Sequence, residues 1–118
     1  MTSSKVKKAV DEVVGEPRMK KKRYVIVRSY AAGVSAGYLE KQSKDGKRVW
    51  LSESRRIWYW KGAASLHELA NEGVKYPDEC KVPAPLKGMH EIMEACEILD
   101  VTPKAKKSIQ SIPIWSAL

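Results

Sequence analysis

Residues 38–52, YLEKQSKDGKRVWLS, give the clearest indication of the fold, because they place Asp45 and Gly46 between two candidate strands, residues 38–43 and 48–52. An Asp-Gly pair in this position is a strong hairpin signal, since a type I′ turn needs positive φ at both central residues. The sequence therefore predicts two antiparallel strands joined by a tight turn.

Further candidate strands lie on both sides of this hairpin. Residues 23–30, RYVIVRSY, are rich in β-branched side chains, which is typical of a buried strand, and residues 53–61, ESRRIWYWK, can form the strand that follows. These segments predict an antiparallel β-meander. Residues 89–101 are ambiguous because their middle has helical propensity, but the Pro-rich connector before them, residues 76–85, favours a strand at a sheet edge.

Two short helices are predicted after the meander. The first begins at a capping Ser65, carries Glu68 three residues later and stops at Gly73. The second begins where Thr102 is followed by Pro103, and it ends near residue 111. The expected fold class is α+β, an antiparallel β-meander sheet with two or three short helices in a single domain.

The basic charge of the chain is concentrated at its start. Residues 1–23 hold eight of the 22 Lys and Arg residues and three of the 14 acidic residues, so their formal charge is +5 and the remainder carries +3. We interpret residues 1–22 as a basic N-terminal extension, either a short helix or disordered, and residues 23–118 as one α+β ligand-binding domain. Such an extension can bind nucleic acid weakly.

Composition and motifs exclude several classes of protein. The chain has two cysteines, no secretory signal and no apolar run of the ~20 residues that a membrane span needs, which indicates a soluble protein of a reducing cytoplasm. His90 and Glu91 begin a zinc-protease pattern, but position 94 is Glu rather than the second His. Phosphate-binding glycine motifs and nucleophile motifs are also missing. We therefore expect a binding protein with no catalytic residues, no metal and no cofactor.

The stretch from 53 to 61 contains the first candidate site. If it is a strand, side chains alternate between faces, and Arg56, Trp58 and Trp60 share one face. An arginine can pair with phosphate, and an indole can stack on a base. The alternative is that the tryptophans pack in the core or at a subunit interface.

Two loops rich in small residues can complete such a site. Residues 29–37 carry glycines and serines whose backbone and hydroxyl groups can bind phosphate oxygens, and residues 62–65 open a predicted helix, whose N-terminus attracts anions. The candidate ligand-binding residues are Arg28, Ser29, Tyr30, Gly33, Ser35, Arg55, Arg56, Trp58, Trp60 and Ser65.

Three stretches carry a resemblance to a known family: YVIVRSYAAGVSAG at 24–37, RRIWYWKGAASL at 55–66 and AKKSIQSIPIW at 105–115. They resemble a large family of small tailed-phage proteins, over about residues 23–116, which we associate with anti-CBASS sponges. The resemblance implies a protein of the infected bacterial cytoplasm that binds a cyclic dinucleotide immune signal such as 3′3′-cGAMP without cleaving it, as a homo-oligomer. It assigns no role to individual residues here.

Physical arguments agree with a sponge in one respect. To compete with a host sensor it must bind tightly, at roughly −12 kcal/mol for a nanomolar constant, and so must enclose much of its ligand. A chain of 118 residues has little room for this, which predicts a site between the subunits of a symmetric dimer or tetramer. The alternatives are a small nucleic-acid-binding phage protein and a protein-protein inhibitor of a host enzyme.

Overall fold

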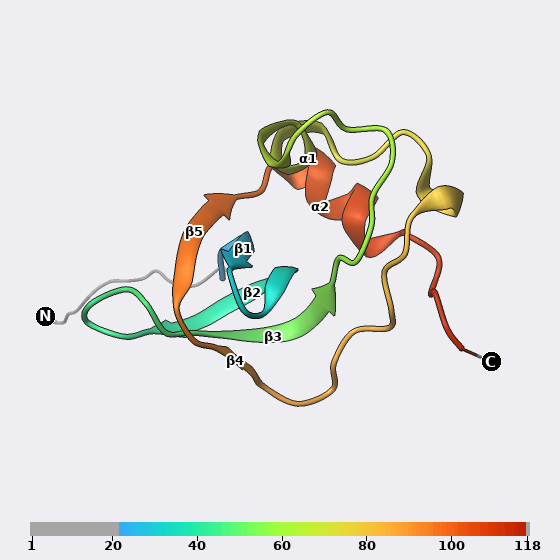
Figure 1. Ribbon diagram of the computed structural model, residues 1–118. Coiled ribbons are helices and arrows are strands. Elements are labelled where there is room, and N and C mark those ends of the chain that lie inside the picture. The colour runs from blue at the N-terminus through green and yellow to red at the C-terminus, as the bar shows by residue number, and fades with distance from the viewer. Residues whose placement is uncertain (1–21, 118) are drawn as a thin grey trace, which may run out of the picture.

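The computed structural model of the protein describes residues 22–117 (Figure 1). The expectation of a short helix or disorder in the N-terminal extension therefore lies, apart from Lys22, outside the described residues. In chain order the elements are β1 (Tyr24–Ser29), β2 (Gly33–Gln42), β3 (Val49–Arg56), α1 (Leu66–Glu72), the 3₁₀ helix η2 (Pro77–Glu79), β4 (His90–Ile92), β5 (Ala95–Asp100) and α2 (Pro103–Gln110).

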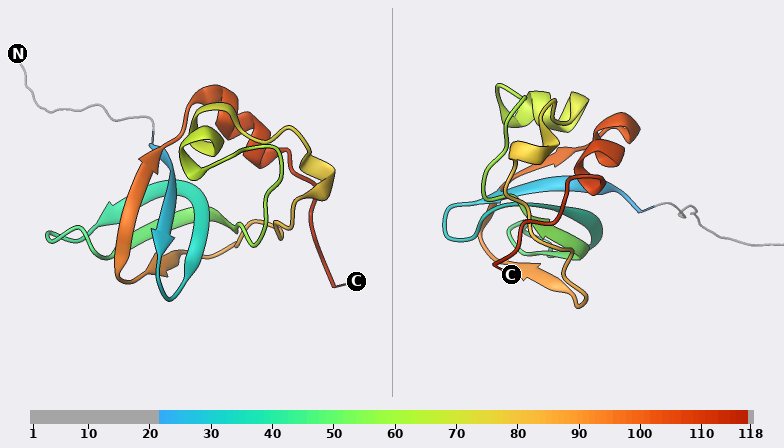
Figure 2. Two further views of the ribbon diagram at one scale, coloured as in Figure 1. Left: turned by 45° about the horizontal axis from the view of Figure 1, so that its top comes forward. Right: turned by 90° about the vertical axis from the view of Figure 1, so that its right-hand side faces the viewer.

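The five strands form one antiparallel sheet in the order β4-β3-β2-β1-β5, and the two helices lie together on one side of it (Figure 1). This confirms the predicted α+β class. The outer strands β4 and β5 lie at opposite edges of the sheet, yet only Met93 and Glu94 separate them in sequence. The sheet must therefore curl until its edges approach each other, as Figure 2 shows. The Ser29 hydroxyl, at the end of β1, donates to the Met93 carbonyl at 3.1 Å and ties the β1–β2 turn to this connection.

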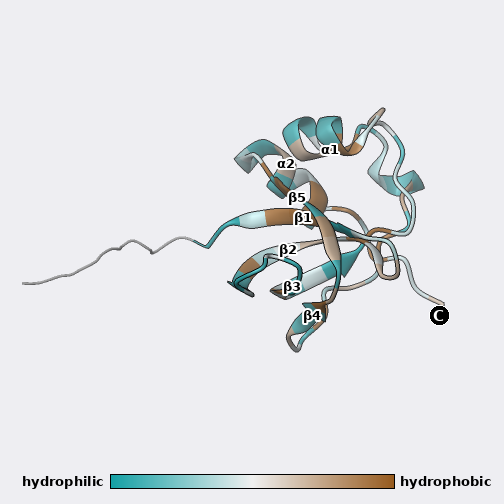
Figure 3. Ribbon diagram, turned by 60° about the vertical axis from the view of Figure 1, so that its left-hand side comes forward, coloured by the Kyte–Doolittle hydropathy of each residue, from teal (hydrophilic) through white to brown (hydrophobic). Residues whose placement is uncertain are grey.

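Both faces of β1 are buried, which explains its unbroken apolar sequence. Tyr24 and Ile26 pack with the helices in one core cluster, and Val25 and Val27 pack inside the curl against a second cluster that includes Leu51. The apolar colour of β1 stands out between the two layers in Figure 3. The prediction of a buried strand is confirmed.

The hairpin is confirmed, but its turn is longer than predicted. The Ser43 N–H donates to the Arg48 carbonyl at 2.9 Å, so four residues form the loop, and within it only Gly46 has positive φ, at 80°. The loop is not the type I′ turn that was predicted. The Asp45 carboxylate stabilises it by accepting hydrogen bonds from the Ser43 hydroxyl and the Lys47 N–H.

The strand predictions around the hairpin need three corrections. Residues 33–37, which were expected to lie in a loop of small residues, belong to β2 and pair with β1. Residues 53–61 do not form a separate strand, because β3 continues through the predicted strand 48–52 as far as Arg56. Residues 89–101 are extended as favoured, but Glu94, with φ of 56°, divides them into β4 and β5. The fourth position beside β3 is thus taken by β4.

The helix predictions are confirmed at both caps. The Ser65 hydroxyl accepts from the Glu68 N–H at the start of α1, and the Thr102 hydroxyl accepts from the Ala105 N–H at the start of α2. Gly73 ends α1 with φ of 80°. None of the helices in residues 22–117 has the length and apolar character that crossing a bilayer requires.

Candidate functional site

A β-bulge in β3 determines which way the adjacent arginines point. The pairing register with β2 shifts at Gly37, opposite Glu53 and Ser54, and Glu53 has φ of 51°. A side chain at Gly37 would lie 2.9 Å from the Ser52 carbonyl oxygen, so glycine permits this close approach. A bulge adds one residue to a strand and re-aims the side chains that follow. Leu51, before it, packs inside the curl, whereas Ile57, after it, packs toward the helices.

Arg55 points into the interior and serves the fold. The residue is 2% exposed, and its guanidinium donates hydrogen bonds of 2.9–3.0 Å to four backbone carbonyls, those of Val82, Pro83, Ile109 and Ile112. Burial lowers the pKa of the guanidinium. The sequence analysis named Arg55 as a candidate phosphate ligand. In the structure its guanidinium instead hydrogen-bonds to backbone carbonyls and so connects β3 with the end of α2 and with the segment that follows η2.

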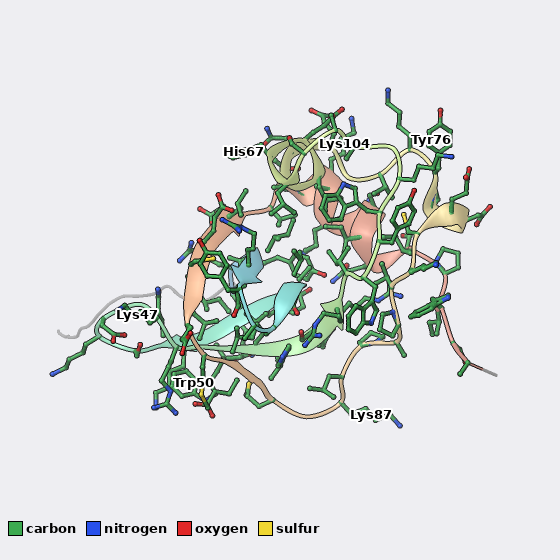
Figure 4. All side chains as sticks on the ribbon, viewed as in Figure 1. Lys47, Trp50, His67, Tyr76, Lys87 and Lys104 are labelled. Atoms are coloured by element: carbon green, nitrogen blue, oxygen red, sulfur yellow. The ribbon has the colours of Figure 1, made fainter. Side chains whose placement is uncertain are left out.

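Arg56, the next residue, faces a cleft between β3 and the connector to β4. The cleft has a volume of about 590 Å³. Its lining is Ser54, Arg56, Pro83, Ala84, Pro85, Leu86, Lys87, Gly88 and His90, which includes basic groups and no carboxylate. The connector is held against β3 by a hydrogen bond of 2.8 Å from the Leu86 N–H to the Ser54 carbonyl. Lys87 lies on the outer side of this connector, and its ammonium points away from the sheet (Figure 4).

The guanidinium of Arg56 is positioned by two neighbours. Its Nε donates to the Ser35 hydroxyl at 3.2 Å, and its Cζ lies 5.2 Å from the ring centroid of Trp58, which is 61% exposed. Within residues 22–117 Arg56 forms no ion pair, whereas Arg28 and Arg48 each pair with a carboxylate. The Arg56 guanidinium is therefore positioned by Ser35 and Trp58, and no carboxylate in residues 22–117 balances its charge.

Ser54 and His90 form a hydrogen-bonded pair in the wall of the same cleft. The Ser54 hydroxyl lies 2.7 Å from Nδ1 of His90. Burial, and secondarily the charge of Arg56, lower the pKa of His90, so the imidazole is neutral near pH 7. Neither residue was among the ligand candidates from the sequence. They meet only because the connector and β4 run back alongside β3, which places His90 next to Ser54.

Trp58 is not part of the cleft lining and borders a second, separate depression of about 340 Å³, which is lined by Trp58, Tyr59, Trp60, Ala63 and Ala64. Trp60 is partly buried against the helix-side core, and its indole N–H donates to the Ala63 carbonyl at 3.2 Å. Of the two tryptophans predicted to share a face with Arg56, Trp58 contacts it and Trp60 lies beyond, in the wall of this second depression.

The other predicted site residues lie away from the cleft. Arg28, Ser29, Tyr30 and Gly33 surround the β1–β2 turn, where Arg28 pairs with Glu97 and Tyr30 is 85% exposed. Ser65 is used as the cap of α1. Of the candidate residues, the structure thus brings together Ser35, Arg56 and Trp58, with Trp60 nearby. The described residues contain no cluster of three or more potential metal ligands.

Comparison with known proteins gives one match. Residues 22–109 match a family described as a domain of unknown function (DUF6948). This match covers well over half of the chain and includes the curled sheet, the cleft and most of α2. No curated protein and no solved structure matches the chain.

Proposed function

We propose that this chain, which belongs to the DUF6948 family, binds and sequesters a cyclic dinucleotide such as 3′3′-cGAMP without cleaving it, in the cytoplasm of a phage-infected bacterium. One observation carries the proposal. Arg56, a guanidinium with no carboxylate partner in residues 22–117, stacks against the exposed indole of Trp58 at the mouth of a cleft that has no acidic lining residue.

The chemistry of the cleft fits an anionic, aromatic ligand. A guanidinium forms bidentate hydrogen bonds with phosphate oxygens, and the cleft lining contains no carboxylate that would compete for Arg56. An exposed indole offers roughly 1–3 kcal/mol of stacking to a base. Because Arg56, which lines the cleft, contacts Trp58, which lines the second depression, a ligand with two phosphates and two bases can use both hollows.

The open side of the cleft supports binding between two copies of the chain. Small-molecule sites have volumes of roughly 300–1,000 Å³ and cover most of the ligand surface. The cleft is within this range but open to solvent on one side. A second subunit placed over Trp58 would complete the enclosure, which is why a homo-oligomer is part of the proposal.

The proposal is sequestration rather than hydrolysis. Ser54 and His90 are the one pair in the cleft with the composition of a nucleophile and its base. Ser54 is only 3% exposed, which leaves its hydroxyl little access to a ligand phosphorus atom. Binding experiments should nevertheless be followed by recovery of the ligand, since intact ligand is what a sponge requires.

The test is calorimetric titration of the full chain with a panel of cyclic dinucleotides and trinucleotides, followed by chromatography of the recovered ligand. We expect tight binding of one or more cyclic dinucleotides, unchanged on recovery, and at least tenfold weaker binding by Arg56→Gln. Arg23→Gln is the matched control, because Arg23 is exposed and paired with Asp100 at the far edge of the sheet. Absence of binding across the panel, or equal binding by Arg56→Gln, would overturn the proposal.

A single-stranded oligonucleotide is the competing ligand. It would use the same arginine and indole together with the basic N-terminal extension, and its affinity would fall steeply with salt. A variant lacking residues 1–21 separates the two ligands. Loss of oligonucleotide binding with retention of dinucleotide binding supports the sponge, and the reverse pattern supports a nucleic-acid-binding protein.

A further inference from the structure

We propose that His90 is a proton-linked phosphate ligand of this cleft, so that binding of a phosphodiester takes up one proton on its imidazole and strengthens as the pH falls. This inference rests on the proposed function and adds to it a second phosphate-binding side chain, supplied by β4, and a dependence on pH. It follows from the arrangement of His90, Ser54 and Arg56.

The ring of His90 is fixed by one nitrogen and leaves the other available. Nδ1 is engaged by the Ser54 hydroxyl at 2.7 Å, and in the described part of the chain Nε2 has no hydrogen-bond partner. Backbone pairing of β4 with β3, which sets His90 opposite Leu51, holds the residue in place. A hydroxyl can donate to the neutral ring or accept from the protonated ring, so Ser54 can keep the same contact in both states.

The charges around His90 favour the neutral ring until an anion arrives. Arg56 on β3 is the cation that acts on it, the ammonium of Lys87 on the connector points away from the sheet, and Ser35 on β2 is uncharged. The acid next in β4, Glu91, is paired with Arg48. In the free protein, burial and Arg56 lower the pKa of His90.

A phosphodiester would reverse this balance. Its negative charge would compensate Arg56 and would also attract a proton to Nε2, where an N–H can donate to a phosphate oxygen. The pKa of His90 would then be higher in the complex than in the free protein. Between those two values, linkage requires the affinity to rise by up to tenfold for each unit by which the pH falls.

The main experiment is calorimetric titration of the full chain with 3′3′-cGAMP between pH 5.5 and 8, in buffers of different ionisation enthalpy. We expect affinity to increase toward acid pH with uptake of close to one proton. His90→Gln should remove the pH dependence, and His67→Gln should retain it, because His67 is exposed on α1, far from the cleft (Figure 4). Tight binding that is independent of pH would overturn this inference and leave the proposed function standing.

A second measurement decides the inference even if no cyclic nucleotide binds and the proposed function fails. Sulfate carries the same charge from pH 5 to 8, so it can be compared with chloride at equal ionic strength while the two histidine rings are titrated by NMR. We expect the apparent pKa of His90 to be higher in sulfate than in chloride. Equal values in the two salts would show that no anion binds at His90.

Discussion

Arg55 and Arg56 are consecutive in β3 and have opposite roles. The guanidinium of Arg55 is enclosed by four backbone carbonyls, and that of Arg56 lies against the exposed ring of Trp58. Because one arginine holds the connector and α2 in place while the other faces the cleft, the same substitution at the two positions should have different consequences.

Arg55→Lys should destabilise the protein by about 3 kcal/mol or more. An ammonium keeps the positive charge but cannot reach four carbonyls in different directions, and each buried group left unpaired costs about 1–3 kcal/mol. Urea unfolding followed by tryptophan fluorescence measures the loss. Arg56→Lys is the matched control and should stay within about 0.5 kcal/mol of the parent while weakening ligand binding. Equal stability of the two variants would contradict the structural role of Arg55.

Trp58→Ala should weaken cyclic dinucleotide binding by roughly 10- to 100-fold, because it removes a stacking surface worth about 1–3 kcal/mol. Trp58→Tyr should keep most of the affinity, since it retains a flat aromatic ring. The control is Trp115→Ala, which removes another exposed tryptophan that lies near a lysine, Lys81. If Trp115→Ala has the larger effect, the ligand does not bind at Trp58.

Gly73→Ala should cost more stability than Gly33→Ala. Both glycines have positive φ, at 80° and 76°, so both substitutions strain the backbone, and Gly73 also has ψ of −155°, a combination that is essentially restricted to glycine. A new Cβ at Gly73 would in addition lie 2.3 Å from Cβ of Ser108 in α2, whereas nothing lies within 4 Å of one at Gly33. Thermal unfolding of the two variants measures the difference. Equal losses would contradict the expectation that the backbone conformation of Gly73 and its close approach to Ser108 add to the cost.

Tyr24→Phe should leave stability at pH 7 unchanged or raise it slightly. The Tyr24 hydroxyl is buried with no hydrogen-bond partner in residues 22–117, so its removal relieves an unsatisfied polar group. Burial also raises the pKa of this phenol above its ordinary value of 10.0. The folded state therefore favours the protonated ring, and the stability associated with it is lost as the pH rises above about 10.

The phenylalanine variant should accordingly lose less stability than the parent between pH 9 and 11. Urea unfolding at several pH values in this range makes the comparison. A Tyr24→Phe variant that is more than about 1 kcal/mol less stable at pH 7 would show that the hydroxyl is hydrogen-bonded in solution.

The local parts of the fold could be predicted because each depends on residues close together in the chain. The apolar run of β1, the hairpin around Gly46 and the caps Ser65 and Thr102 all carry their signals within a few residues. The length of the hairpin loop was less predictable, since the Asp45 side chain hydrogen-bonds within the turn and replaces the expected geometry.

The candidate site was predictable only in part. Alternation along the chain correctly placed Arg56 and Trp58 together, but the same reasoning could not tell that Trp60 would pack against the core or that Arg55 would be buried. His90 entered the sequence reasoning only as part of a metal motif. No local signal connects it with Ser54, which lies 36 residues earlier.

Residues close together in the chain were enough to predict the α+β class, the central hairpin and the two capped helices, and to mark residues 53–61 as a candidate site with arginines beside aromatic residues. Packing of distant segments determines which arginine is available, because the bulge opposite Gly37 sets the directions of Arg55 and Arg56 in β3. It likewise determines that Ser54, Arg56 and His90 share one cleft. The physical reason is that propensity and capping act over a few residues, whereas a strand register and a returning connector are set by the packing of segments far apart in the chain.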